Sequence, residues 1–452
     1  MFANIILINV LYFVRYKFQM TKIQSWGRLS NTEHQVIPLI TATQTVKQLK
    51  NITYSGIAHG MGRSYGDAAL NGNGVLWLTT AMNHLISFNL NLGILHCEAG
   101  TTLQDIHRTL IPQGWMLPVT PGTQMITVGG AIANDVHGKN HHAFGSFGDH
   151  VLYIKLLRTD GEIIECSKND RADWFYATLG GVGLTGIILE AKIQLRSVQS
   201  PWVLSETIPY HNLDDFFALS DSSEANWEHT VSWIDCMNGL NAKGLFSRGN
   251  LSNEHSQAAP PIKDKIFPVT PPISLVNKLS LPLFNFAYFH ANSLKKQPQT
   301  VYYESFFYPL DAIHEWNKMY GTKGFYQYQS VVPKEIGKEV TQEMLKTIKK
   351  SGEGSFLAVL KTFGNRESGG LLSFPKPGVT LALDFPNRGE KTLKVLNELD
   401  HIIQEAQGRL YLAKDTRMPR SLFESGYPRF NEFLKYRDPG ISSEMSRRLL
   451  DI

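Results

Sequence analysis

Ala58-His59-Gly60-Met61-Gly62-Arg63-Ser64-Tyr65-Gly66-Asp67 places three glycines within seven residues, between two apolar-rich segments. Glycine lets the backbone turn with a positive φ and lets N–H groups approach a ligand, because no Cβ stands in the way. Successive free N–H groups in such a turn form a concave nest that holds phosphate oxygens. A single glycine-rich loop is equally compatible with an ordinary tight turn, so the interpretation depends on the turns that follow.

Further glycine-dense turns follow at intervals, separated by apolar runs. They are Pro121-Gly122-Thr123, Val128-Gly129-Gly130-Ala131-Ile132-Ala133, His137-Gly138-Lys139-Asn140-His141-His142 and Gly180-Gly181-Val182-Gly183-Leu184-Thr185-Gly186. The spacing indicates one long phosphate-bearing ligand that is wrapped by several loops.

This series of loops resembles the FAD-binding domain of the vanillyl-alcohol-oxidase family of flavoproteins. The strings GMGRSYGD, TVGGAIA, HGKNHH, GSFG and GLTGII, with Gln327-Tyr328-Gln329 and Tyr411-Leu412-Ala413-Lys414-Asp415, are similar to the decaprenylphosphoryl-ribose 2-oxidase branch of that family. The resemblance runs from about Trp26 to the C-terminus. It implies an α+β, two-domain fold, with a PCMH-type FAD-binding domain and an antiparallel-sheet substrate domain.

Length and composition agree with a globular protein of more than one domain. A chain of 452 residues is too long for a single core. The net charge of +4 comes from scattered basic residues and does not indicate a nucleic-acid partner. Cys97, Cys166 and Cys236 are widely spaced and odd in number, which predicts no disulfide framework and favours a reducing compartment.

The N-terminus carries an apolar run from Phe2 to Val14, followed by Arg15 and Lys17. The run is shorter than the roughly 20 residues that span a bilayer, and it lacks the basic start of a secretory signal. It is either a membrane-surface anchor or a stretch upstream of a true start at Met20. We favour the second interpretation, because the family resemblance begins only after Met20.

The chain is expected to divide into an extension (1–25), the FAD-binding domain (26–200), a substrate-binding domain (201–408) and a C-terminal segment that returns to the FAD domain (409–452). Residues 249–300 are rich in Pro, Ser and Asn, which predicts a long loop. Within that region, the apolar stretch from Leu281 to Tyr288 is expected to be core. The alternative is a mobile apolar loop that suits a lipid-bearing substrate.

A β-α-β-β-α-β unit is predicted in the substrate domain. Hydrophobic residues recur every four positions over 336–348, every three or four positions over 393–403, and every second position over 379–385. The predicted elements are strands 326–332, 355–361, 379–385 and 410–412 and helices over 336–348 and 393–403, the last ending at Gly408. This unit would form the floor of a substrate domain over the flavin.

Flavin-dependent oxidation of a sugar alcohol needs a group that takes the hydroxyl proton and a positive charge near the flavin. The resemblance places Lys414 beside flavin and substrate, where a cation stabilises developing negative charge. The alternative is a surface lysine paired with Asp415. The resemblance also makes His137 a residue that orients the hydroxyl or accepts its proton, with Tyr65 as the competing acceptor.

The other site residues are also assigned by the resemblance. The predicted FAD contacts are Gly60, Met61, Gly62, Arg63, Ser64, Tyr65, Gly122, Thr123, Gly129, Gly130, Ala133, Asn134, His137, Gly138, Gly183, Ile187 and Tyr411. The predicted substrate contacts are Lys139, Trp233, Gln329, Lys361 and Lys414. Lys361, at the end of a strand, could bind a phosphate group. No metal site is expected, because Gly138 and Asn140 disfavour the helix that would bring His137, His141 and His142 together.

Arg63 stands where many covalent flavoproteins of this superfamily have a histidine that bonds the flavin, so we expect dissociable FAD. Two residues on the predicted substrate-facing sheet differ from the family pattern. Actinobacterial members often have Cys at the position of Ala382 and Asn at that of Thr380. These departures leave the identity of the sugar open.

The resemblance implies FAD-dependent oxidation of the 2′-hydroxyl of a polyprenyl-phosphate pentose to the 2′-keto sugar, the first half of an epimerisation in cell-envelope arabinose synthesis. An NAD(P)H-dependent short-chain reductase would be the partner that acts on the product. The expected location is cytoplasmic, with peripheral contact at the inner membrane. Two alternatives stay open, an FAD-dependent oxidase of free sugars, polyols or aldonolactones that uses O₂, and a flavin-binding protein without turnover.

Overall fold

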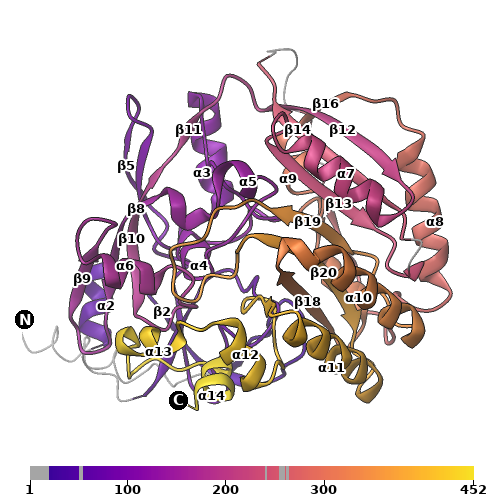
Figure 1. Ribbon diagram of the computed structural model, residues 1–452. Coiled ribbons are helices and arrows are strands. Elements are labelled where there is room, and N and C mark those ends of the chain that lie inside the picture. The colour runs from indigo at the N-terminus through magenta and orange to yellow at the C-terminus, as the bar shows by residue number, and fades with distance from the viewer. Residues whose placement is uncertain (1–19, 50–53, 240–241, 254–259, 261–263, 452) are drawn as a thin grey trace, which may run out of the picture.

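The computed structural model describes residues 20–49, 54–239, 242–253, 260 and 264–451. The fold is α+β, as predicted. Figure 1 shows the N-terminal sheets on the left, a large sheet on the right, and the C-terminal segment (yellow) back beneath the left half. The apolar run from Phe2 to Val14 lies outside the described residues, so both interpretations of it stay predictions.

The glycine stretch that begins at Gly60 directly follows a buried strand of the first sheet. This sheet has the order β1-β2-β4-β3, and both β2 and β3 pair with β4 in parallel. The strands are β1 (Met20–Lys22), β2 (Glu33–Pro38), β3 (Gly56–His59) and β4 (Val75–Leu78). Ile57 and Trp77 are buried in its core, so the loop after β3 starts from a fixed position.

The second sheet is antiparallel and has five strands. Its order is β5 (Leu85–Asn89), β6 (Ile94–Glu98), β10 (Ile187–Gln194), β8 (Val151–Leu157) and β9 (Ile163–Cys166). A hairpin turn at residues 159–162 joins β8 and β9, with Gly161 at φ 90°. α3 (Leu103–Leu110) and α4 (Val128–Ala133) pack their apolar residues against this sheet.

The third sheet is antiparallel and has eight strands. In order across the sheet they are β16 (Gln299–Tyr302), β12 (Trp202–Tyr210), β14 (Gly244–Leu251), β13 (His229–Ile234), β19 (Val359–Phe363), β20 (Gly378–Pro386), β18 (Phe325–Val332) and β21 (Arg409–Leu410). The predicted β-α-β-β-α-β unit is present as β18, α10 (Gly337–Ser351), β19, β20, α11 (Glu390–Glu405) and β21. α10 and α11 cover the face of β20 that carries Leu381 and Leu383.

Two boundaries of this unit differ from prediction. The strand expected over 355–361 begins later, as β19 at Val359. After α11 the left-handed residue is Gln407, at φ 51°, and not Gly408. Gly408 is needed for a different reason, because a Cβ there would lie 2.8 Å from the carbonyl oxygen of Val331.

The stretch 249–300 is not one long loop. It contains β15 (Lys265–Ile266), α8 (Ser280–Ser293) and the start of β16. The apolar run expected to be core is only partly buried, since Leu281 is 3% exposed while Leu283 and Phe286 are 70% and 59% exposed. Among the described residues, no helix is long and apolar enough to cross a bilayer.

The C-terminal segment contacts the N-terminal sheets. Ile441 forms a parallel bridge with Gly56, and Arg448 donates to the carboxylates of Asp67 and Asp415. The boundaries proposed at 200/201 and 408/409 stay predictions.

Candidate active site

A cavity of about 870 Å³ lies between the third sheet and the glycine-rich loops. This volume is typical of a cofactor and substrate site. Because side chains alternate along a strand, every second residue of six neighbouring strands faces the cavity. These residues are Ser205, Thr207, Leu245, Ser247, Val231, Trp233, Val359, Lys361, Thr380, Ala382, Gln327 and Gln329.

The opposite wall is built by the first glycine loop and α4, which contact each other closely. A Cβ at Gly60 would lie 2.6 Å from Thr127 Oγ1. Thr127 is the residue that caps α4, since Gly130 N donates to its hydroxyl at 3.1 Å. Gly62 has φ 62°, which disfavours a side chain. Glycine is therefore required here to bring two loop backbones to one side of the cavity.

With one exception, every residue predicted to contact FAD or substrate lines this cavity. The exception is Ile187, whose side chain is fully buried in the core, while its neighbours Gly186 and Ile188 line the cavity. Successive residues of β10 point to opposite faces of the sheet. Ile187 therefore does not line the cavity, whereas Gly186 and Ile188 do.

The cavity wall contains buried polar atoms that the described residues leave without a hydrogen-bond partner. They are Arg63 Nε, Asn134 Oδ1, His137 Nδ1 and Gln327 Oε1. Buried polar groups in folded proteins are nearly always paired. Polar atoms without a partner beside a glycine-lined wall fit a long polar ligand such as FAD.

Lys414 stands at the centre of the site. Its Nζ lies 3.8 Å from the centre of the Tyr65 ring, and its backbone turns through a hydrogen bond from Lys414 N to Tyr411 O at 2.9 Å. Asp415 instead pairs with Arg448 at 2.9 Å. Burial lowers the pKa of Lys414, partly offset by the nearby carboxylate of Asp384.

Asp384 is a site residue that the sequence analysis missed. It is fully buried on β20 and accepts hydrogen bonds from Gln327 Nε2 at 2.7 Å and from Tyr320 OH at 3.4 Å. Burial raises the pKa of its carboxyl group. The signal in the sequence was an acidic residue within a hydrophobic strand, in register with Thr380 and Ala382.

His137 is held against the third sheet as a neutral ring. Gln329 Nε2 donates to His137 Nε2 at 3.0 Å, which places the ring proton on Nδ1. Burial, with the neighbouring charge of Lys361, lowers the pKa of His137 well below its usual range. A ring in this state is a hydrogen-bond donor and a weak base.

Tyr65 is also a weak candidate for a proton acceptor in its ionised form. Burial, and to a smaller extent Asp384, raises the pKa of its phenol well above the usual value. Tyr65 is therefore a neutral phenol packed edge-on against Phe325, with ring centres 5.6 Å apart.

Two further lysines face the same cavity. Lys361 Nζ donates to Gly138 O at 2.7 Å, and Lys139 Nζ donates to the carbonyl oxygens of Phe306 and Phe307. Burial lowers the pKa of each lysine to about 7, and for Lys361 the charges of Lys139 and Lys414 contribute. The three lysines thus create a positive field that suits an anionic ligand.

Trp233, a predicted substrate contact, and Tyr411, a predicted FAD contact, form part of the cavity wall. Trp233 Nε1 donates to Phe356 O at 2.9 Å, and its ring lies 5.0 Å from that of Tyr288. Tyr411 donates from its hydroxyl to Asn134 O at 2.9 Å, which joins the segment before Lys414 to the loop after α4.

Residues 44–167 match the FAD binding domain family. Over 451 aligned residues the chain is 36% identical to the decaprenylphosphoryl-beta-D-ribose oxidase of Mycolicibacterium smegmatis, covering 95% of this chain and 97% of that protein. The chain belongs to the decaprenylphosphoryl-β-D-ribose oxidase family. It is an FAD-dependent oxidoreductase with a PCMH-type FAD-binding domain.

Other proteins match a smaller share of this chain. An uncharacterized protein from the mprA 5′ region of Streptomyces coelicolor is 29% identical over 77% of this chain and 99% of its own length. The L-gulonolactone oxidase of Mus musculus is 29% identical over 32% of this chain and 34% of its own length. The alignment with the Mycolicibacterium smegmatis oxidase covers 95% of this chain and therefore extends well beyond the matched FAD binding domain.

Proposed function

We propose that this enzyme oxidises the 2′-hydroxyl of a polyprenyl-phosphate pentose to the 2′-keto sugar. The observation that carries the proposal is the convergence of Lys139, Lys361 and Lys414 on one cavity that is walled on its other side by glycine loops. Three cations suit a ligand with a phosphate group beside its sugar. The name of the relative that covers 95% of the chain supports the lipid-linked ribose as the donor.

FAD, when bound, supplies the acceptor for the hydride that leaves the carbinol carbon. Gly60 and Gly62 would hold its pyrophosphate through their backbone N–H groups. The N–H groups of Gly129 and Gly130 donate to Ala99 O and Thr127 Oγ1, so these two glycines would admit the ligand through their lack of a side chain. FAD is proposed to bind without a covalent link, because Arg63 replaces the bonding histidine and its guanidinium lies over the Trp26 ring at 4.0 Å.

The hydroxyl proton is assigned to the pair of Lys414 and Asp384. A lysine whose pKa is lowered by burial is partly uncharged near neutral pH and can accept a proton. His137 donates from Nδ1 and orients the sugar, since its Nε2 is occupied by Gln329. Tyr65 lines the cavity as a neutral phenol.

The product would pass to a separate NAD(P)H-dependent short-chain reductase that completes the epimerisation. A lipid-linked donor also favours a cytoplasmic enzyme in peripheral contact with the inner membrane. Both statements are part of the proposal and are supported by the family resemblance.

Anaerobic flavin bleaching tests the proposal. Purified holoenzyme is mixed with a polyprenyl-phosphate ribose and, separately, with free pentoses, polyols and aldonolactones, while the absorbance of the oxidised flavin is followed. We expect rapid bleaching by the phosphate-linked ribose alone. Bleaching by free polyols or lactones instead would identify an oxidase of free sugars, and no bleaching by any alcohol would identify a flavin-binding protein without turnover.

A further inference from the structure

α8 (Ser280–Ser293) is apolar on nearly all sides but is buried on only one. Leu281, Asn285 and Phe289 recur every four residues and are 3%, 1% and 4% exposed. Leu283 and Phe286, on the other side, are 70% and 59% exposed. A helix that is hydrophobic all round is normally enclosed by protein or by lipid, so this outer face lacks a covering among the described residues.

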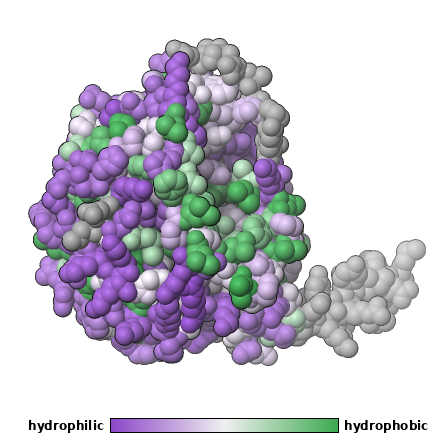
Figure 2. All heavy atoms as spheres, turned by 90° about the vertical axis from the view of Figure 1, so that its right-hand side faces the viewer, coloured by the Kyte–Doolittle hydropathy of each residue, from purple (hydrophilic) through white to green (hydrophobic). Residues whose placement is uncertain are grey.

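The exposed apolar surface continues on both sides of the helix. Val269 and Ile273 before α8, with Leu279 and Leu294 at its ends, are between 65% and 87% exposed. Figure 2 looks at this side of the molecule and shows hydrophobic residues gathered there. Large exposed apolar patches on soluble proteins mark interaction or membrane sites.

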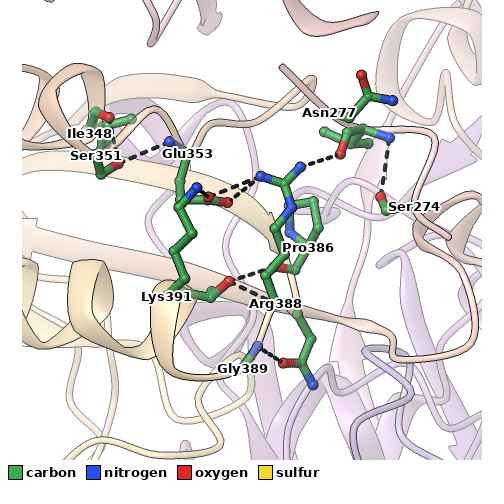
Figure 3. A network of polar contacts seen from close by, with 12 residues as sticks. Ser274, Asn277, Ile348, Ser351, Glu353, Pro386, Arg388, Gly389 and Lys391 are labelled. Carbon is green, nitrogen blue, oxygen red and sulfur yellow. Dashed lines mark hydrogen bonds and ion pairs between the residues drawn. The ribbon is translucent and has the colours of Figure 1, made fainter. Parts of the chain in front are cut away.

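The helix is firmly attached, so its outer side chains have a rigid support. Asn285 Nδ2 donates to Asp235 Oδ1 at 2.6 Å. Arg388 donates to Val276 O at 2.9 Å, just before the helix, and is itself paired with Glu353 at 2.8 Å (Figure 3). Glu353 is fully buried and also pairs with Lys391 at 3.0 Å.

The same segment contributes residues to the wall of the active-site cavity, and two of them, Phe284 and Tyr288, are also 37% and 39% exposed. Phe284, Tyr288, Asn292 and Lys295 of this segment line the cavity that contains Lys414. The rings of Phe284 and Tyr288 stack with centres 5.6 Å apart. The outer apolar face therefore passes without interruption into the wall of the site.

The charge of this segment has one sign. Between Lys265 and Tyr303 the sequence contains no aspartate or glutamate, whereas Lys278, Lys295 and Lys296 lie within about one helix length of the patch. All three lysines are exposed. Basic residues that flank an apolar helix face attract the anionic head groups of a bilayer.

We propose that the outer face of α8 docks on an anionic lipid bilayer, with Leu279, Leu283 and Phe286 entering the boundary between head groups and acyl chains. The cavity mouth would then open at the membrane surface, so a lipid-linked sugar could enter the site while its polyprenyl chain stays in the bilayer. This proposal rests on the proposed function and specifies how the enzyme reaches its substrate.

Vesicle co-sedimentation of the holoenzyme tests the docking. The full chain is incubated with vesicles of phosphatidylcholine and phosphatidylglycerol, and Leu283→Ser/Phe286→Ser is compared with a matched control, Ile86→Ser/Leu90→Ser. Ile86 and Leu90 are 47% and 54% exposed on the N-terminal half. We expect the α8 variant to lose at least about tenfold in vesicle partitioning, because two large apolar side chains no longer enter the lipid. The control should bind as the wild type does.

The docking proposal would be overturned if the wild-type enzyme did not co-sediment with these vesicles, or if the α8 variant bound them as well as the control does. It would also be overturned by a wild-type dimer that the α8 variant converts to a monomer in light scattering, because a second copy would then cover the face. Retained flavin absorbance in both variants excludes misfolding.

A water-soluble short-chain prenyl-phosphate ribose separates this proposal from the proposed function. It should bleach the flavin of the wild type and of the α8 variant at the same rate, because neither Leu283 nor Phe286 lines the cavity. Vesicle binding without any bleaching would reject the proposed substrate and leave the docking surface standing.

Discussion

The ammonium group of Lys414 lies 3.8 Å above the ring of Tyr65, although the two residues come from opposite ends of the chain. The backbone holds them together, because Tyr65 N donates to Ala413 O at 2.9 Å. The first glycine loop and the segment that carries the principal cation are therefore one structural unit. A ligand held by the loop is automatically placed against the lysine.

Lys414→Met should reduce the rate of anaerobic flavin bleaching by on the order of 10²–10⁴, because the group proposed to accept the hydroxyl proton is lost. FAD should still bind, since the glycine loops are unchanged. Stopped-flow absorbance measures the rate. The matched control is Lys346→Met on the outer face of α10, with a side chain 63% exposed. Equal rates for the two variants would remove Lys414 from the chemistry.

The stability of the flavin-free protein should rise with pH above about 7. Burial lowers the pKa of Lys139 and of Lys361 to about 7 in the folded state, against roughly 10.4 when unfolded. Between these values the unfolded chain binds more protons, so raising the pH favours the folded state. Below pH 7 these lysines are protonated in both the folded and the unfolded state, so they do not make the free energy of unfolding depend on pH.

Above pH 7 the free energy of unfolding should rise less steeply with pH in Lys361→Met than in the wild type. The difference is at most about 1.4 kcal/mol per pH unit, the value for one proton. Urea unfolding of the apoprotein at pH 7, 8 and 9 measures it. A variant with the same slope as the wild type would show that Lys361 keeps an ordinary pKa in the folded protein.

Gly66→Ala should destabilise the protein by about 1–3 kcal/mol or more, as expected for overpacking. A Cβ at Gly66 would lie 1.6 Å from the carbonyl oxygen of Asp415, so the loop and the Lys414 segment must separate. Denaturant unfolding measures the effect. Gly122→Ala is the control, because a Cβ there meets nothing within 4 Å. Similar unfolding free energies for both variants would contradict the close contact.

Acid precipitation should release the flavin. Arg63 lies over the Trp26 ring and offers no nucleophilic nitrogen of the kind that histidine supplies. After precipitation and centrifugation, the yellow colour is expected in the supernatant. Colour that stays in the washed pellet would demonstrate a covalent link and disprove the assignment.

The elements predicted correctly are those with a strong local pattern. The alternation along β20 and the four-residue repeat of α10 each depend on neighbours a few positions away. Such patterns follow from backbone geometry and can be recognised in a single sequence. The motif resemblance added the cavity-lining residues, since each short string keeps its place in the fold.

The predictions that failed depend on contacts between distant segments. The run from Leu281 to Tyr288 is apolar in sequence, yet its exposure depends on where α8 sits relative to Asp235. Ile187 and Ile188 are chemically alike, and only the placement of β10 between two layers distinguishes them. Asp384 gained its role from Gln327 and Tyr320, which no local pattern connects to it.

The residues alone indicated a long phosphate-bearing ligand held by glycine turns and predicted the main helices and strands, because backbone freedom and side-chain periodicity are local properties. The family resemblance supplied the FAD-binding fold and the site residues. The protonation states of Lys361, His137 and Asp384, and the outward face of α8, arise only once separate segments meet. Burial and the electrostatic field depend on three-dimensional distance, and distance along the chain does not encode them.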